Sequence, residues 1–320
     1  MSTNKQAVLV EPGRLELRDG RRPTPGAGEL LIRVAACGLC NWELNHFHGR
    51  LGTCPQNLGH EITGTVAALG EGVKEFKEGD AVTGFVHRNM DGFSEYCLFT
   101  EQSTFKLDAK VEAKFALGEP LSCVVTTLQG VEAGAGDAVV VLGCGPMGLW
   151  CIQALAGGLL SALIAVDVQP ERLALAKRFG ATHMVNPKTE DAAAVVGQIT
   201  GGRLADVVIE GTGSPTVWTS AVNYLKNGRG RMIMMSSHET AGAAFDWRPL
   251  QVKGATIKVT HPSFAADGTD SLRRAIALYN RGVFQVEPLV THRFSLDQIQ
   301  QAFEALANKP QGYLKGAVIM

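Results

Sequence analysis

The sequence predicts an α/β protein made of a doubly wound parallel sheet and a β-rich, barrel-like domain. Residues 7–100 consist of short runs rich in Val, Ile, Thr and Phe, and no helix-length period appears before about residue 112. From about residue 124, apolar strands alternate with helices of about 10–15 residues, which is typical of a parallel sheet covered by helices on both faces. A glycine-rich turn joins the first of these strands to its helix.

The β-rich domain is expected to comprise residues 1–122 and 263–320, and the parallel sheet residues 123–262. The last sixty or so residues are assigned to the first domain because a separate tail of that length would bury little apolar surface. The strands expected in the first hundred residues are 29–37, 61–70, 80–85 and 93–100.

The second part of the chain repeats a strand and a helix several times. The expected strands are 137–143, 162–168, 182–186, 205–213 and 229–237. The expected helices are 144–158, 169–180, 189–202 and 214–228. The final residues contain a helix at 269–282, a strand at 290–295 and a helix at 295–308.

Composition excludes several classes of function. Apolar residues make up 45% of the 320 residues and charged residues 19%, as in globular proteins. The net charge is −1 and basic residues form no run, so neither nucleic acid nor a membrane surface is expected as a partner. The longest apolar stretch, 154–166, is interrupted by glycine and serine and is too short to span a bilayer.

Cysteine usage indicates a reducing compartment. The seven cysteines are scattered and odd in number, and the N-terminal residues lack the cationic and apolar pattern of a secretory signal. Reduced thiols, most of them buried in the core, are therefore expected, and with them a cytoplasmic location.

The glycine-rich turn "GCGPMG" has the setting of a dinucleotide-binding loop. A buried strand precedes it and a helix follows. Gly143 permits the tight turn, Gly145 lets the backbone approach a pyrophosphate, and Gly148 lets the helix pack closely on the strand. The start of the helix supplies free N–H groups for the phosphates. Pro146 and Met147 lie at this position and are included in the expected cofactor site. A glycine-rich turn without a ligand is the alternative.

An acidic residue follows at the distance expected for a ribose-binding carboxylate. Asp167 closes the next strand, 19 residues after Gly148. Its carboxylate would accept hydrogen bonds from the adenosine ribose and would repel a 2′-phosphate, which favours NAD over NADP. Arg172 lies five residues further on and weakens this preference.

The stretch "ACGLCNWELNHFHGR" concentrates possible metal ligands. Cys37 and Cys40 have the spacing of a zinc-binding pair, but no second pair of this kind occurs in the chain, and a closed structural site needs four ligands. A metal site, a disulfide and an ordinary strand-to-helix corner all remain open from these residues alone.

Further candidate ligands lie elsewhere in the sequence. His60 and Glu61 begin an expected strand, and Glu119 lies where the first domain passes into the second. Taken singly, Cys40 would be interpreted as a core thiol, His60 as a hydrogen-bonded turn residue and Glu119 as a helix-capping carboxylate. Together with a dinucleotide domain, Cys40, His60 and a carboxylate would form a three-ligand zinc site with one position open for water or substrate.

The motifs together resemble the zinc-dependent medium-chain dehydrogenases, which include alcohol, polyol and threonine dehydrogenases. The resemblance covers nearly the whole chain and rests on "CGLC", "GHEITGTVAALGEGVKEFKEGDAV", "DGFSEY", "EPLSC", "GCGPMG" and "VTHRFSLDQIQQAFE". It implies a GroES-like β-rich catalytic domain and a Rossmann domain.

The resemblance also implies roles for particular residues. Cys40, rather than Cys37, and His60 would be zinc ligands, and Glu61 a ligand or near-ligand. Glu119 matches the polyol branch, in which this glutamate binds zinc directly or through its water. Arg293 falls where that branch has an arginine near the substrate.

Two departures from the family pattern matter. The lobe with four closely spaced cysteines is missing, since only Cys97 lies in that region, so one catalytic zinc and no structural zinc are expected. Trp42 replaces a Ser or Thr, and Asn45 replaces a proton-relay histidine. Trp42 cannot relay a proton because its indole N–H only donates. We expect it to form a wall of the substrate pocket, which favours a cyclic substrate.

The expected function is hydride transfer between NAD(H) and a secondary alcohol or ketone of a polyol, cyclitol, sugar or amino-alcohol, assisted by zinc. A zinc-free quinone or enoyl reductase is one alternative, which the Cys, His and Glu set argues against. A nucleotide-binding protein that has lost catalysis is another, suggested by Trp42. The expected partners are a small alcohol or ketone and further copies of the chain, in a dimer or tetramer.

Overall fold

The computed structural model describes residues 3–237 and 246–320, which form two compact units. Unit 1 comprises Met1–Ser122 and Leu272–Met320, and unit 2 comprises Cys123–Ser271. The chain thus returns to unit 1 at Leu272, later than the expected residue 263. One reason is that the hydroxyl of Thr126 donates a hydrogen bond to Ser271 (3.2 Å), which ties the end of this segment to unit 2.

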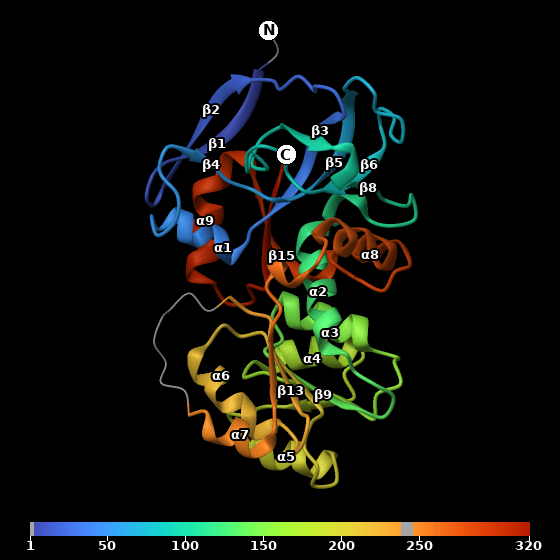
Figure 1. The fold of residues 1–320 in the computed structure, drawn as a ribbon. Coiled ribbons are helices and arrows are strands. Elements are labelled where there is room, and N and C mark those ends of the chain that lie inside the picture. Colours follow the sequence, from blue (N-terminus) through green and yellow to red (C-terminus); the bar gives the residue numbers. More distant parts are fainter. Residues whose placement is uncertain (1–2, 238–245) are drawn as a thin grey trace. The chain divides into compact units, whose positions relative to one another are not determined.

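Unit 1 is built on a seven-stranded sheet (Figure 1). Its strands run in the order β15-β16-β3-β5-β6-β8, and β7 also pairs with β3. The strands are β3 (Glu29–Gly38), β5 (Glu61–Leu69), β6 (Ala81–Gly84), β7 (Tyr96–Thr100), β8 (Thr104–Lys106), β15 (Val290–Ser295) and β16 (Lys315–Ile319). β3 lies in the middle of the sheet, so its side chains are buried at nearly every position, and this explains its almost continuous apolar sequence.

A smaller sheet and a C-terminal helix complete the core of unit 1. The strands β1 (Thr3–Glu11), β2 (Arg14–Arg21) and β4 (Gln56–Asn57) form the three-stranded sheet. Helix α9 (Ile299–Asn308) buries residues at helical spacing, including Phe303. The ring of Phe303 lies 5.2 Å from that of Phe47 and 5.5 Å from that of Phe93, which joins the helix to the core.

Unit 2 contains a six-stranded parallel sheet in the order β11-β10-β9-β12-β13-β14 (Figure 1). The strands are β9 (Ala138–Leu142), β10 (Ala162–Val166), β11 (His183–Val185), β12 (Val207–Glu210), β13 (Arg231–Met234) and β14 (Thr256–Val259). Numbered within the unit, this is the order 3-2-1-4-5-6 of dinucleotide-binding sheets. All residues of β9 and β10 are buried, as expected for strands covered on both faces.

The remaining helices connect these strands. The α-helices are α1 (Asn41–Phe47), α2 (Gly118–Val131), α3 (Pro146–Leu155), α4 (Pro170–Arg178), α5 (Ala192–Ile199), α6 (Pro215–Ser220), α7 (Arg248–Lys253) and α8 (Gly268–Asn280). Short 3-10 helices lie at Glu101–Ser103, Ala113–Phe115, Ala221–Tyr224, Pro262–Phe264, Glu287–Leu289 and Leu296–Gln298. No helix within the described ranges is long and apolar enough to cross a membrane.

The structure confirms the expected fold class, a doubly wound parallel sheet with a second, β-rich part, and each expected strand and helix is present with adjusted ends. Helix α1 shows no helix-length period in the sequence because its seven residues are too few, and it corresponds to the strand-to-helix corner that was one of the open alternatives. The strands β1, β2, β4, β8, β14 and β16 and the helices α2 and α7 were not anticipated.

Candidate metal centre

Three of the candidate ligands lie together in unit 1. Gly38, at the end of β3, pairs with Glu61, the first residue of the antiparallel strand β5. This pairing brings the turn after β3, which carries Cys40, next to His60 and Glu61. One ligand atom from each of Cys40, His60 and Glu61 lies within 4.8 Å of the others. Among the described residues this is the single group of three or more such side chains that could hold a metal ion.

The two cysteines of the opening stretch have different surroundings. Cys37 is fully buried in the apolar core, and its burial raises the pKa of the thiol well above its usual range. Cys40 immediately precedes α1 and is partly exposed. Both thiols are free, so the stretch is a strand-to-helix corner that contributes one thiol to the cluster and no disulfide.

Glu119 approaches the cluster from the first turn of α2. Its Oε2 lies 3.7 Å from Nε2 of His60. Two ligands of one tetrahedral zinc are separated by a similar distance when each lies at about 2.0–2.1 Å from the metal. Glu119 is therefore placed to bind a metal at His60 directly or through a water molecule.

Glu43 is a part of the site that the sequence analysis missed. It is completely buried on α1 and accepts hydrogen bonds at Oε1 from the backbone N–H of Gly59 (2.8 Å) and from Nδ1 of His60 (3.0 Å). Since a carboxylate only accepts, Nδ1 carries the proton, and Nε2 of His60 is left to bind a metal. Its position three residues after Cys40, in the first turn of a helix, was the available signal.

Lys315 is a second missed residue. Its Nζ lies 2.6 Å from Oε2 of Glu61 and donates a hydrogen bond to the carbonyl oxygen of Leu39 (3.1 Å). Burial by itself would lower the pKa of Lys315, but the charges of Glu61 and Cys40 raise it overall. The available signal was a lone lysine opening the apolar run "LKGAVIM".

The electrostatics of the cluster favour a cation. Burial would lower the pKa of His60, but Glu43, Cys40 and Glu119 outweigh it and raise this pKa well above its usual range. Burial raises the pKa of Cys40, and the His60 contact lowers it only in part. A thiol, an imidazole and carboxylates form a donor set that suits zinc. The residues present therefore fit a catalytic zinc ion.

Trp42 lies on α1 beside the cluster. Its indole ring centre is 5.5 Å from that of His60 and 4.5 Å from that of His46, both in edge-on contact. About a third of Trp42 remains exposed (36%). His46 itself is buried and contacts Oε1 of Gln56 through Nδ1 (3.0 Å), while Asn45 is also buried.

Arg293 makes contacts outside this cluster. Its guanidinium pairs with Glu287 (3.1 Å) and lies over the ring of Phe115, 4.3 Å from the ring centre. Neither partner belongs to the group of candidate metal ligands, so a substrate role for Arg293 stays a prediction.

The glycine loop of unit 2 has the geometry that each glycine was expected to provide. Gly143 follows β9 with a φ of +92°, a conformation that favours glycine. A Cβ at Gly148 would lie 2.0 Å from the carbonyl oxygen of Gly143, so only glycine allows α3 to pack this closely. A Cβ at Gly145 would meet no described atom within 4 Å, which leaves this face of the loop open. Pro146 begins α3 and Met147 follows it.

Asp167 is attached to the glycine loop itself. Its Oδ2 accepts a hydrogen bond from the backbone N–H of Cys144 (2.7 Å), and its Oδ1 accepts one from Gln169 (2.8 Å). Nη1 of Arg172 lies 3.9 Å from Oδ2. The carboxylate is nearly buried yet retains acceptor capacity on both oxygens, so it could bind ribose hydroxyls while it holds the loop.

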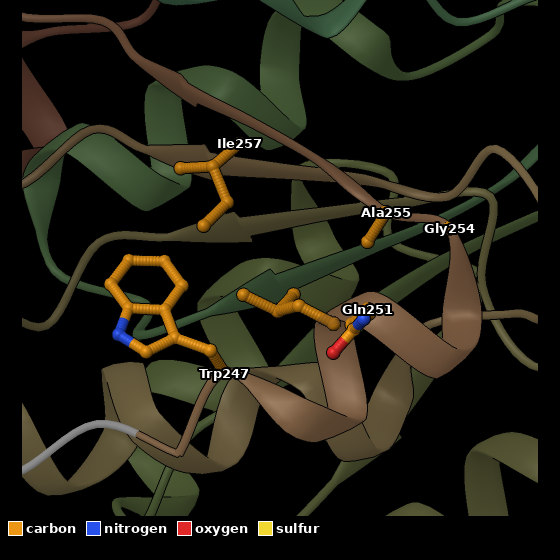
Figure 2. A pocket seen from close by; sticks show the side chains of 6 residues that line it. Trp247, Gln251, Gly254, Ala255 and Ile257 are labelled. Carbon is orange, nitrogen blue, oxygen red and sulfur yellow. The ribbon is translucent and has the colours of Figure 1, made fainter.

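A pocket in unit 2 lies away from this loop. Figure 2 shows Trp247, which precedes α7, and Gln251 on α7, together with Ala255 and Ile257. Gly254 and Ala255 precede β14, whereas the glycine loop follows β9. Because the strands are parallel, the two features lie at opposite ends of the sheet, and the pocket is not the expected nucleotide site.

Comparison with known families matches both parts of the chain. Residues 26–116 match the family model described as the alcohol dehydrogenase GroES-like domain. Residues 146–280 match the model described as the zinc-binding dehydrogenase domain.

Individual relatives are similar over most of their length. The chain is 30% identical to the (R,R)-butanediol dehydrogenase of Bacillus subtilis, over 89% of this chain and 90% of that protein. It is 27% identical to the sorbitol dehydrogenase of the same organism, over 94% and 92% of the two chains. One similar solved structure is a protein from Sinorhizobium meliloti that is described as a zinc-binding dehydrogenase and contains bound NADP. Its TM-score is 0.88 and its sequence identity 25%, over the full length of both chains.

Proposed function

The chain belongs to the zinc-dependent medium-chain alcohol dehydrogenases, and from this membership we propose that it transfers a hydride between NAD(H) and a secondary alcohol or ketone. The observation that carries the proposal is the grouping of Cys40, His60 and Glu61 in unit 1, in a chain whose unit 2 has an open glycine loop held by an aspartate. The substrate class would be a polyol, cyclitol, sugar or amino-alcohol.

Cys40 and His60 would both bind one catalytic zinc. Glu61 and Glu119 are the candidates for the carboxylate ligand. Support comes from the short distances among these side chains and from the tautomer of His60 that Glu43 selects. We further propose that the protein binds no structural zinc. When bound, zinc would supply Lewis-acid polarisation of the substrate oxygen and so lower the pKa of the hydroxyl.

The protein residues would handle the proton that the alcohol loses. Trp42 occupies the place of a relay hydroxyl, and its indole N–H cannot accept a proton. Glu119 is the better placed acceptor, because its Oε2 lies 3.7 Å from the metal-facing nitrogen of His60 and its side chain is 17% exposed. Glu61 is less suited, because Lys315 already contacts one of its oxygens. Glu119 would therefore pass the proton to solvent water.

NAD is the proposed cofactor. Asp167 would accept hydrogen bonds from the ribose hydroxyls, and its charge would disfavour the 2′-phosphate of NADP. Arg172 would partly offset this charge, since it lies 3.9 Å from the carboxylate. The S. meliloti relative was crystallised with NADP.

Trp42 would form a wall of the substrate pocket. The support is its partial exposure and its ring contact with His60, one of the proposed ligands. A flat aromatic surface beside the metal favours a ring-shaped substrate over a small linear alcohol. Arg293 would contact a polar group of that substrate.

We also propose a reduced, cytoplasmic homo-oligomer, either a dimer or a tetramer. All seven cysteines are free. Among the described strands of unit 2, β14 lies at an edge of the sheet and pairs only with β13. Four apolar residues close to β14 in the sequence are exposed: Trp247, Val252, Val259 and Phe264. Exposed apolar side chains at a sheet edge are typical of a subunit interface. Light scattering of the purified protein measures the number of subunits.

The activity is tested by incubating the protein with NAD and a panel of polyols, inositols, sugars and amino-alcohols while NADH absorbance is followed. We expect turnover of at least one secondary alcohol and its loss after zinc is removed by a chelator. NADH formation that is insensitive to metal removal would contradict the zinc mechanism. Absence of turnover with bound NADH would favour a nucleotide-binding protein without catalysis.

A further inference from the structure

A buried ion pair lies directly behind the candidate metal ligands. Gly38 on β3 pairs with Glu61 of β5 on one side and with Ala317 of β16 on the other. A Cβ at Gly38 would lie 1.9 Å from Oε2 of Glu61, so the missing side chain makes room for this carboxylate. Lys315 reaches the same oxygen from β16, with its Nζ at 2.6 Å.

Lys315 is itself held in place. Its Nζ donates to the carbonyl oxygen of Leu39, the residue before Cys40, and the N–H of Leu39 donates to Gly316 (2.9 Å). The side chains of Lys315 and Glu61 are only 8% and 2% exposed. The ammonium group is therefore fixed between the backbone that carries one ligand and the carboxylate of another.

The pair affects how Glu61 can meet a metal. A carboxylate without partners can bind a cation through one oxygen or both, whereas Oε2 of Glu61 lies against Gly38 and is paired with Nζ of Lys315 at 2.6 Å. Together with His60, the three acidic groups Cys40, Glu61 and Glu119 make four possible donors, one more than a catalytic zinc takes from the protein.

We infer that Lys315 is a positioning residue that reserves Oε2 of Glu61 and so limits Glu61 to one oxygen at the metal, which keeps a ligand position open for the substrate. The inference rests on the proposed zinc-dependent function. It distinguishes the two carboxylates: Oε2 of Glu61 is paired with Lys315, whereas Oε2 of Glu119 lies 3.7 Å from Nε2 of His60.

A positioning role and a purely structural role predict opposite changes in metal affinity. If the pair only supports the fold, removing Lys315 disorders the site and weakens metal binding. If Lys315 restrains Glu61, removing it frees a second carboxylate oxygen and deletes a nearby positive charge. Both changes strengthen the binding of a divalent cation.

The test uses cobalt(II), whose visible absorption reports its ligands. It is titrated into metal-free wild-type protein and into the variants Lys315→Met, Lys315→Arg, Glu61→Gln and Lys315→Met/Glu61→Gln. We expect Lys315→Met to bind cobalt about tenfold more tightly than wild type, with a changed absorption spectrum and lower kcat. Lys315→Arg keeps a cation and should retain the wild-type spectrum. The double variant replaces the pair by neutral groups of similar volume, so it should fold and should lose the extra affinity.

An unchanged cobalt affinity and spectrum in Lys315→Met would overturn the inference, and so would equal weakening in Lys315→Met and the double variant. If Lys315→Met does not fold, the cobalt spectra of the double variant and of Glu61→Gln are compared. A difference between these two spectra would also overturn the inference, because Lys315 would then affect the metal without Glu61. A wild-type protein that binds neither cobalt nor zinc removes the proposed function as well. If the wild-type enzyme is active with zinc and Lys315→Met has the cobalt affinity and spectrum of wild type, the inference fails while the proposed function stands.

Discussion

Glu43 and His60 form a buried pair in which Oε1 of the carboxylate lies 3.0 Å from Nδ1 of the imidazole. The same oxygen accepts the backbone N–H of Gly59, and Oε2 accepts that of Cys40 at 3.4 Å. One carboxylate thus holds the histidine and the backbone of both proposed ligands. This arrangement fixes which nitrogen of His60 faces a metal.

Glu43→Gln should weaken zinc binding by about 10–100-fold, because an amide holds the histidine less firmly and makes it less basic. The measurement is a competition titration with a chelator of known zinc affinity. Glu78→Gln, which changes an exposed glutamate of unit 1, is the matched control and should bind zinc as wild type does. Equal affinities for Glu43→Gln and the control would remove Glu43 from the site.

Asp167 should decide the choice of cofactor. We expect wild type to bind NADH at least about tenfold more tightly than NADPH, since a hydrogen bond to a charged group contributes about 1.5–3 kcal/mol. Asp167→Asn should abolish most of this ratio but keep an oxygen for the N–H of Cys144, whereas Asp167→Ala should weaken both cofactors. Fluorescence titration of the three proteins with NADH and NADPH measures the six affinities. A wild-type protein with equal affinity for both cofactors would refute the assignment.

Trp42→Ser should raise KM for the true substrate by about tenfold without abolishing turnover, because the substrate loses an aromatic surface but no metal ligand. Trp247→Ser removes an exposed tryptophan of unit 2 and serves as control, with no change expected in KM. Steady-state kinetics with cyclic and linear alcohols separate the outcomes. If Trp42→Ser leaves KM for cyclic alcohols unchanged, Trp42 is a packing residue.

Asp91 should make stability depend on pH. Burial raises the pKa of Asp91 to about 7, and its Oδ1 has no hydrogen-bond partner among the described residues. In the unfolded chain an aspartate has a pKa of about 3.9, so between these values the folded state binds the extra proton. The stabilisation is full below pH ~4 and is lost as pH rises through ~7.

At pH 8, the free energy of unfolding of Asp91→Asn should therefore be about 2–4 kcal/mol higher than that of wild type. At pH 4, the two proteins should have similar free energies of unfolding. Urea denaturation at the two pH values measures this. A difference between variant and wild type that is the same at both pH values would show that the charge of Asp91 is not responsible.

Much of the fold could be predicted from the sequence because local patterns carry it. The alternation of buried strands and helices after residue 124 and the glycine turn at Gly143 indicate the parallel sheet without tertiary information. The hairpin β1–β2 was missed although its turn signal, Pro12–Gly13, was present. The return of the chain to unit 1 was placed too early because contacts such as that between Thr126 and Ser271 leave no trace in a local window.

The site could be predicted only in part, for a similar reason. Cys40, His60 and Glu61 lie near the ends of neighbouring strands, so motif and topology together bring them close. Lys315 reaches Glu61 across Gly38 from a strand distant in sequence, and no spacing rule relates these residues. A charged residue in an apolar strand was the one available hint.

The zinc content of purified wild type, Cys37→Ala and Cys40→Ala tests the central claim most directly, because it asks whether this corner of the fold holds a metal and through which thiol. Cys37 is buried in the core, whereas Cys40 belongs to the ligand group. We predict one zinc per chain in wild type and in Cys37→Ala, and none in Cys40→Ala. Zinc retained by Cys40→Ala and lost by Cys37→Ala would contradict the account.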